Sequence, residues 1–405
     1  MASQFNFEIA KELPNGLGRA GLIRTPHGDI ETPAFAVVGT HATVKYLTPD
    51  EVRSTGATVM LSNGYHLYRK AAEIDAAGGL AEYSGWRGPT MTDSGGFQVM
   101  SLGSGIGKVV SMDKRDIARE QAKSAKKDRL SQVSDSGVSF RHPTDGKIET
   151  FTPEVSMQIQ HQIGADIMMA FDELTSIGDS YEYNVAALRR THAWARRCLK
   201  GHQKLTAARA DKPYQALYGV LQGAHYKSLR RRTAGYLGRL DFDGYGLGGA
   251  FEKERLGDIL QWCNQELPKT KPRHLLGLSK PDDIFVGAEN GVDTFDCVAP
   301  TREARHGRLY TLDGNINIRN SVFAEDDSPI DAECDCPTCQ SGLTRAELRR
   351  LLKSPESADK ETAFKLASIH NVHFIVNLLK QIRHSILAGN FIKFRDLWLE
   401  RYYKK

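Results

Sequence analysis

The segment from Thr92 to Gln98, Thr-Asp-Ser-Gly-Gly-Phe-Gln, brings several kinds of chemically useful side chain together. Its two glycines allow the backbone to approach a ligand closely, and Phe97 can stack on a flat ring. Asp93 and Gln98 can form hydrogen bonds, and a carboxyl group can also move protons. The segment suits a planar, polar substrate such as a nucleobase, although a polar turn after a strand can have the same composition.

A second acid, Asp296, lies near the end of an apolar segment at 292–298 that we predict to be a buried strand. Arg302 and Arg305 follow shortly after it. An acid at a strand end beside two arginines is typical of chemistry next to a phosphate group. The alternative is a structural ion pair between Asp296 and Arg302.

A cluster of cysteines near the end of the chain indicates a metal site. Three of the six cysteines lie within six residues, and they are Cys334, Cys336 and Cys339. In a chain without a secretion signal, clustered cysteines favour zinc over disulfides. Tetrahedral zinc needs a fourth ligand. His370 is our first candidate because it lies in a predicted helix that can fold back onto the cluster, and His373 and His384 are its rivals.

The composition sets limits on location and partners. The 405 residues carry 54 basic and 49 acidic side chains, a formal net charge of +5, which allows a polyanionic partner without requiring one. Residues 1–20 lack the apolar core of a signal peptide, and no apolar run approaches the roughly 18 residues that a membrane span needs. We therefore expect a cytoplasmic protein that does not enter a membrane.

The order of predicted elements indicates an α/β fold. Helix start signals at 48–51, 152–154 and 280–283 are each followed by a glycine, an apolar strand and a polar residue. Asp172 and Gln222 are such residues, each directly after an apolar strand. Recurring units of this kind predict a parallel sheet, and polar residues at strand ends suit a (β/α)8 barrel. A doubly wound open sheet is the alternative.

Taken together, these motifs resemble the tRNA-guanine transglycosylases of the bacterial type. The resemblance rests on Asp93 to Gln98, Phe295 to Cys297, Pro300 to Arg302 and the three cysteines with His370, and it extends from about Phe7 to Tyr403. It implies a single catalytic (β/α)8 TIM barrel over residues 1–405 that contains a C-terminal zinc-binding subdomain at about 310–385.

The resemblance also implies a reaction. Members of the family exchange the guanine at the wobble position of tRNAs with GUN anticodons (Asp, Asn, His and Tyr) for a 7-deazaguanine base in queuosine biosynthesis, with no nucleotide cofactor. By resemblance, Asp296 is the nucleophile that captures the ribose as a covalent intermediate. Asp93 is the general acid and base that serves both halves of the exchange.

The remaining site residues carry over from the family in the same way. We expect the base to be bound by Ser94, Asp172, Gln222 and the backbone of Gly249, with its ring between Phe97 and Leu276. Arg302 and Arg305 are expected to hold the tRNA backbone. The family further implies one structural Zn²⁺ per protomer and a homodimer.

Three departures from the family pattern concern the incoming base and the tRNA. Leu174 replaces a cysteine, and the usual Gly-Gly-Leu-Ala-Val-Gly-Glu becomes Gly-Gly-Ala-Phe-Glu-Lys-Glu at 248–254. About 25 extra residues form a charged insertion at about 104–133, which is either a solvated loop or an added tRNA-facing arm.

Several alternatives remain open at the level of sequence. The small aminomethyl base preQ1 is the expected substrate, and direct salvage of queuine is the main alternative. A glycoside hydrolase also fits a barrel with paired acids, but it gives no reason for a zinc site near Arg302 and Arg305. A non-catalytic tRNA-binding subunit does not need both Asp93 and Asp296.

Overall fold

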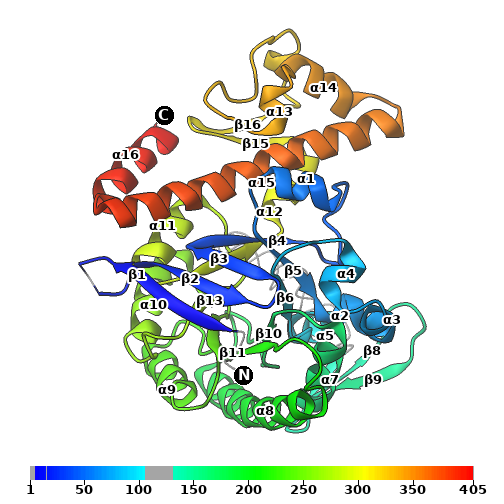
Figure 1. Cartoon of the computed structure of the whole chain (residues 1–405), viewed down its shortest axis with the longest axis vertical. Coiled ribbons are helices and arrows are strands. Elements are labelled where there is room, and N and C mark those ends of the chain that lie inside the picture. The colour runs from blue at the N-terminus through cyan, green and yellow to red at the C-terminus, as the bar shows by residue number, and fades with distance from the viewer. Residues whose placement is uncertain (1–4, 15, 105–130, 405) are drawn as a thin grey trace.

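Eight parallel strands form a closed barrel at the centre of the molecule (Figure 1). The computed structural model describes residues 5–14, 16–104 and 131–404. The barrel confirms the (β/α)8 prediction and excludes the open sheet, because β14 pairs with β4 and closes the circle. Its strands are β4 (Ala34–Val38), β5 (Val59–Asn63), β6 (Thr90–Asp93), β10 (Ile167–Met169), β11 (Ala216–Leu221), β12 (Gly244–Leu247), β13 (Arg273–Leu275) and β14 (Thr294–Cys297).

Helices surround the barrel and several begin at the predicted signals. Thr48 and Glu51 form a complete capping box at the start of α1, and Thr152 caps α7 before Pro153. The helices that follow the barrel strands are α1 (Pro49–Ser54), α2 (Gly64–Leu67), α3 (Ala71–Ala76), α4 (Leu80–Ser84), α5 (Gly96–Ser104), α7 (Pro153–Ile163), α8 (Tyr181–Ala208), α9 (Lys227–Leu237), α10 (Leu256–Asn264), α11 (Pro281–Glu289) and α12 (Ala299–Arg305). Short 3₁₀ turns are η1 (Tyr68–Lys70), η2 (Lys253–Arg255) and η3 (Ser321–Phe323).

A three-stranded antiparallel sheet packs against the apolar interior of the barrel at its amino-terminal side. It consists of β1 (Asn6–Glu12), β2 (Arg19–Thr25) and β3 (Gly28–Thr32). Its residues Ile23 and Ile30 are fully buried, and they share one apolar cluster with the inward-facing barrel residues Val59, Met91 and Ile167. The sheet therefore contributes to the core on which the barrel strands rest.

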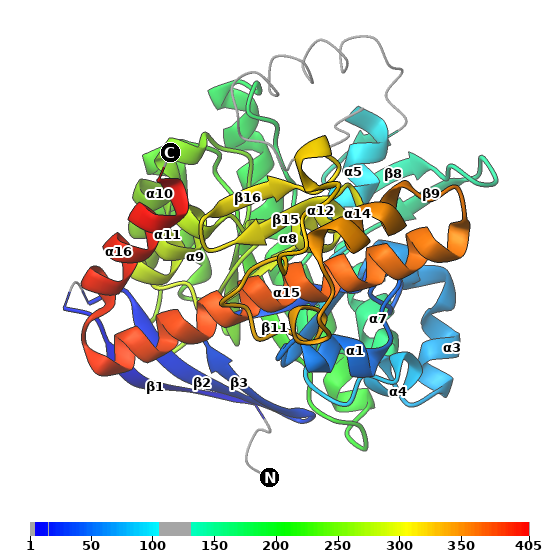
Figure 2. The same ribbon diagram turned by 90° about the horizontal axis from the view of Figure 1, so that it is seen from above.

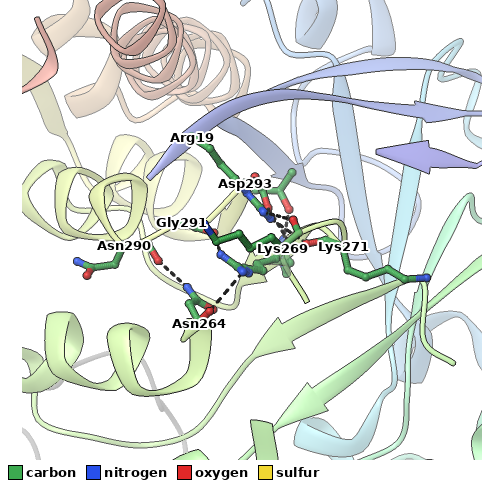
Figure 3. A network of polar contacts seen from close by, with 10 residues as sticks. Arg19, Asn264, Lys269, Lys271, Asn290, Gly291 and Asp293 are labelled. Atoms are coloured by element: carbon green, nitrogen blue, oxygen red, sulfur yellow. Dashed lines mark hydrogen bonds and ion pairs between the residues drawn. The ribbon is translucent and has the colours of Figure 1, made fainter. Parts of the chain in front are cut away.

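A buried ion pair connects this sheet to the start of β13 and β14 (Figure 3). Arg19 donates hydrogen bonds of 2.9 and 2.6 Å to the two carboxylate oxygens of Asp293, and neither side chain is exposed by more than 1%. Arg19 also donates to the carbonyl oxygens of Lys269 and Lys271. The backbone N–H of Arg273 donates to Asp293 at 2.7 Å. The network fixes the positions at which the two strands begin.

A second small sheet follows α5 and was not predicted. It contains β7 (Ser131–Val133), β8 (Val138–Arg141) and β9 (Ile148–Phe151) in an antiparallel order. Most of the predicted charged insertion at 104–133 lies outside the described residues, which resume at β7.

The C-terminal part of the chain adds a hairpin, a cysteine-bearing loop and a long helix. Its elements are β15 (Arg308–Thr311), β16 (Gly314–Asn317), α13 (Pro337–Gln340), α14 (Arg345–Lys353), α15 (Ser357–Ala388) and α16 (Phe391–Tyr403). Figure 2 shows α15 running across the molecule from α14 to the β1–β3 sheet. Near its end, Arg383 donates to the carbonyl oxygens of Gly21 and Thr32.

This C-terminal part has an apolar cluster of its own beside the main core. The buried members are Ala304, Leu309, Ile318, Ile330, Leu348, Leu352, Ala363 and Ala367. Among the helices of the described residues, none is long and apolar enough to cross a membrane.

Candidate active site and metal centre

Four of the predicted site residues lie where barrel strands end. Asp93 is the last residue of β6, Asp296 lies in β14, and Asp172 and Gln222 follow β10 and β11 closely. Because parallel strands of a barrel share one carboxyl end, the four side chains gather at the same mouth. Hydrogen bonds and charges connect them.

Asp93 is held by donors from the end of β5 and from the loop that follows Asp93 itself. Asn63 donates to Asp93 Oδ2 at 2.5 Å, and the backbone N–H groups of Gly64 and Gly95 donate to Oδ1 at 2.9 and 3.1 Å. Burial raises the pKa of Asp93 to about 7, the two backbone hydrogen bonds lower it, and the charges of Asp296 and Asp172 raise it further. A carboxyl group with such a pKa can both give and take a proton near neutral pH.

Asp172 and Gln222 form the polar wall of the mouth. Gln222 Nε2 donates to Asp172 Oδ2 at 2.6 Å, and Ser94 Oγ donates to Oδ1 at 3.4 Å. Burial raises the pKa of Asp172 to about 6, against the lowering effect of these two hydrogen bonds. The Oε1 atom of Gln222 is buried and has no hydrogen-bond partner within the described part of the chain. The wall therefore offers acceptors to N–H groups of a ligand.

Gly249 brings backbone next to Gln222. It has a φ of +113°, and a Cβ atom there would lie 2.5 Å from Arg230 Nη2 and 3.0 Å from Gln222 Oε1. Both facts restrict this position to glycine. A Cβ atom at Gly248 would likewise lie 3.3 Å from Leu276, so Leu276 borders the same loop.

Arg230 supports this loop from behind, and our sequence analysis did not identify it. Its guanidinium is fully buried and donates to the carbonyl oxygens of Ala224, Leu221 and Gly248, the last at 2.7 Å. The ring of Phe251 lies 5.4 Å from the Arg230 guanidinium carbon. Arg230 is the first of three consecutive arginines, and nothing in the sequence distinguishes it from the other two.

Asp296 takes its contacts from β13 and the loop after it. His274 Nε2 lies 3.1 Å from Asp296 Oδ1, and the backbone N–H of Gly277 donates to the same oxygen at 2.9 Å. The structural ion pair with Arg302 that we considered is not found among the described residues. Asp296 therefore stays available to a ligand at the barrel mouth. The sequence did not indicate either of its partners, His274 and Gly277.

Phe97 and Leu174 lie close to this wall. Phe97 is half-buried in the first turn of α5, directly after Gly96, where a Cβ atom would lie 3.1 Å from the carbonyl oxygen of Asp172. Leu174 is half-buried two residues beyond Asp172. The expected sandwich of a base between Phe97 and Leu276 stays a prediction.

Arg302 and Arg305 lie on α12, which begins directly after β14. Burial lowers the pKa of Arg305, and the charge of Arg302 lowers it further, so the two cations are near each other. Arg305 Nη1 is buried and has no partner in the part of the chain that the structure describes. Two adjacent cations with an unsatisfied donor are suited to an anion such as a phosphate.

The four predicted zinc ligands come together in the C-terminal part. Their ligand atoms all lie within 4.8 Å of one another, and the residues are Cys334, Cys336, Cys339 and His370. The three sulfur atoms are 3.6, 3.6 and 3.4 Å from His370 Nδ1. A tetrahedral zinc ion with bonds of about 2.0–2.3 Å spaces its ligands roughly 3.3–3.8 Å apart, so the donor set fits structural zinc.

His370 is also oriented as a metal ligand should be. Its Nε2 lies 2.7 Å from the carbonyl oxygen of Tyr310, which fixes a proton on Nε2 and leaves Nδ1 to face the sulfur atoms. The rival His373 is engaged with Asp335 and with the carbonyl oxygen of Thr55, and His384 is exposed further along α15.

The chain is similar over its length to one family of proteins. The family model described as Queuine tRNA-ribosyltransferase matches residues 15–404. A protein of that name from Pelotomaculum thermopropionicum is 42% identical over 389 residues, which cover 95% of each chain. A protein of the same name from Halothermothrix orenii is 40% identical over 410 residues, which cover 100% of this chain and 99% of the relative. Another from Herpetosiphon aurantiacus is 41% identical over 402 residues, or 98% of this chain and 93% of the relative.

Proposed function

Because this chain belongs to the queuine tRNA-ribosyltransferase family, we propose that it exchanges the wobble guanine of tRNAs with GUN anticodons for a 7-deazaguanine base. Membership makes it a tRNA-guanine transglycosylase, which is a pentosyltransferase. One observation carries the proposal within the structure: Asp93, Asp172, Gln222 and Asp296 converge at one barrel mouth, where two of the acids have raised pKa values.

In the proposed mechanism two acids divide the work. Asp296 attacks the anomeric carbon of the ribose as the bond to guanine breaks, and Asp93 gives a proton to the leaving guanine. In the second half Asp93 takes a proton from the incoming base, which displaces Asp296 from the ribose. The pKa of about 7 for Asp93 supports this double role.

The proposed base site consists of Ser94, Asp172, Gln222 and the backbone of Gly249, with Phe97 and Leu276 on the two ring faces. Asp172 and Gln222 offer acceptors to the N1–H and exocyclic amine of a guanine-like edge. The target base must leave its stack to reach them. We propose that Arg302 and Arg305 bind the phosphates on either side of it.

The zinc ion is proposed to have a structural role. Four protein ligands close its coordination shell, so no position stays open for a substrate. The separate apolar cluster at the C-terminal end supports a zinc-binding subdomain at about 310–385 within a single catalytic unit. We further propose a cytoplasmic homodimer, as the family implies.

For the incoming base we propose preQ1, with queuine as the alternative. The loop 248–254 that departs from the family pattern is fixed at Lys253, which pairs with Asp282 and, at 3.2 Å, with Asp283. Ala250 and Leu174 change the walls of the site without changing its charge. Both bases carry an ammonium, so shape must decide between them. Competition of the two bases for one tRNA tests this, and a clear preference for queuine contradicts preQ1.

The test of the proposed activity is exchange of labelled guanine into a tRNA with a GUN anticodon. Asp296→Ala should abolish both the exchange and a covalent enzyme–RNA adduct trapped with a slow substrate. Glu266→Gln, which changes an acid that follows the C-terminal end of α10 and pairs with Arg231, should retain both. An adduct that persists in Asp296→Ala reassigns the nucleophile, with Asp93 as the next candidate. Hydrolysis of aryl glycosides without exchange would instead favour a glycoside hydrolase.

A further inference from the structure

His274 and Thr294 form a polar pair behind Asp296, inside the barrel. His274 Nδ1 lies 2.9 Å from Thr294 Oγ1, and its Nε2 lies 3.1 Å from Asp296 Oδ1. His274 and Thr294 are partners in the β13–β14 ladder, and both are completely buried. A buried polar group without a hydrogen-bond partner is costly. The two ring nitrogens of His274 therefore need their contacts with Thr294 and Asp296.

The chemistry of the three groups fixes where the protons lie. An ionised carboxylate can only accept hydrogen bonds, so the Nε2 atom of His274 must carry the proton that it shares with Asp296. A neutral imidazole then has a bare Nδ1, and the hydroxyl of Thr294 donates to it. The Asp296 carboxylate therefore selects the tautomer of His274, and Thr294 satisfies the remaining ring nitrogen and holds the ring in the orientation that donates to Asp296.

Within the described ranges, two hydrogen bonds reach the Asp296 carboxylate, and both end on the same oxygen. His274 and the backbone N–H of Gly277 both donate to Oδ1. Gly277 has a φ of +78°, a conformation that favours glycine and that aims this N–H at the carboxylate. Oδ1 is therefore held in place, and Oδ2 is the oxygen left to approach a ribose.

We propose that His274, oriented by Thr294, is a positioning residue that selects Oδ2 of Asp296 as the attacking atom. This inference rests on the proposed exchange reaction. The Oδ2–C1′ bond forms as the bond from C1′ to guanine breaks, and the bonding electron pair leaves with guanine, which gains the proton of Asp93. In the second half the incoming base bonds to C1′ and loses its proton to Asp93. The C1′–Oδ2 bond breaks, and its electron pair stays on Oδ2 of Asp296.

The two donors at Oδ1 should matter more in the second half than in the first. They stabilise the negative charge that Asp296 regains when it leaves C1′. In the first half, losing a donor impairs the position of the carboxylate but also makes it more basic, and these effects oppose each other. Loss of the hydrogen bond between Thr294 and His274 should therefore slow discharge of the adduct more than its formation, so that the adduct accumulates.

Thr294→Val tests the proposal because it removes only the hydroxyl, and Thr294→Ser is the matched control that keeps it. We expect Thr294→Val to slow adduct discharge about tenfold, the effect of one lost hydrogen bond, with KM for tRNA and base within about twofold of wild type. Thr294→Ser should restore discharge to within about threefold of wild type. If Thr294→Val does not fold, His274→Gln serves as the second variant and should also accumulate adduct.

A spectroscopic readout separates orientation from a loss of packing. In protein labelled with ¹⁵N-histidine, the His274 signals, assigned by their loss in His274→Gln, should show a proton on Nε2. In Thr294→Val the Nδ1 signal should shift, because Nδ1 loses its hydrogen bond with the Thr294 hydroxyl. Unchanged ring signals together with wild-type discharge overturn the proposal.

The outcomes also separate this proposal from the proposed function. If wild-type protein forms no adduct, or if Asp296→Ala still forms one, the exchange mechanism itself is wrong. If an Asp296-dependent adduct forms and Thr294→Val discharges it at the wild-type rate, only the positioning role is wrong.

Discussion

The charge of Asp296 acts on Asp93 across the barrel mouth and helps to keep a proton on it. Burial is the largest cause of the raised pKa of Asp93, and the charges of Asp296 and Asp172 raise it further. Two backbone hydrogen bonds lower it in part. The negative charge of Asp296 thus favours the protonated form of Asp93, which is the form that can give a proton.

Formation of the covalent adduct should therefore depend on the proton of Asp93. With a pKa of about 7, Asp93 is mostly protonated below pH 7 and loses its proton above it. Single-turnover adduct formation should change little between pH 6 and pH 7 and should fall by up to about tenfold per pH unit above this range. Rapid-quench measurements from pH 6 to pH 9 check this, and a rate that rises with pH would assign the proton donor elsewhere.

The protein should contain one zinc ion per protomer, and the ion should support the fold of the C-terminal part. Cys336→Ser should lose the zinc and lower the free energy of unfolding by an amount on the order of several kcal/mol, because binding energy at a closed site is folding energy. Elemental analysis and thermal unfolding measure both effects. Cys263→Ala, which changes a buried cysteine outside the cluster, should keep its zinc. Full stability in Cys336→Ser would show that the metal is dispensable for folding.

Binding of tRNA should weaken as salt is added, and Arg302 should contribute to that dependence. Arg302→Ala should raise KM for tRNA with little change in KM for guanine. It should reduce the slope of log K against log salt concentration by about 0.7–0.9, the contribution of one phosphate contact. Arg231→Ala, an exposed arginine on α9 that pairs with Glu266, is the control. An unchanged slope and KM in Arg302→Ala would remove this residue from the tRNA contact.

Arg19 should contribute far more to stability than an exposed arginine on the same strand. Arg19→Ala leaves Asp293 buried without its partner, and such a loss typically costs about 3–5 kcal/mol. Arg24→Ala on β2 removes side-chain contacts that are about half exposed, and should leave the free energy of unfolding almost unchanged. Denaturant unfolding of both variants measures the difference. Equal costs would show that the buried network is not what holds β13 and β14.

Much of the site could be predicted from sequence because its chemistry lies in short, contiguous motifs. Asp93 lies in the glycine-containing segment 92–98, Asp296 lies near the end of an apolar segment, and the cysteine spacing leaves few metals to consider. The helix start at Thr48 was also readable, because a capping box depends on residues only three positions apart. Such features are local, so their meaning does not depend on the rest of the fold.

Other parts of the site depend on contacts between distant segments, which only the tertiary structure decides. The closure of the barrel rests on the pairing of β14 with β4, which lie more than 250 residues apart. His274 gains its role only because β13 pairs with β14 in a register that sets it beside Thr294 and Asp296. By sequence, Arg230 is an ordinary residue of a helix. Only the fold buries it and places its guanidinium within hydrogen-bond distance of the Gly248 carbonyl oxygen. The sequence determined which groups are present and near which strand ends they lie. Their distances, shared protons and shifted pKa values follow from burial and strand register, because these depend on what the whole fold packs around them.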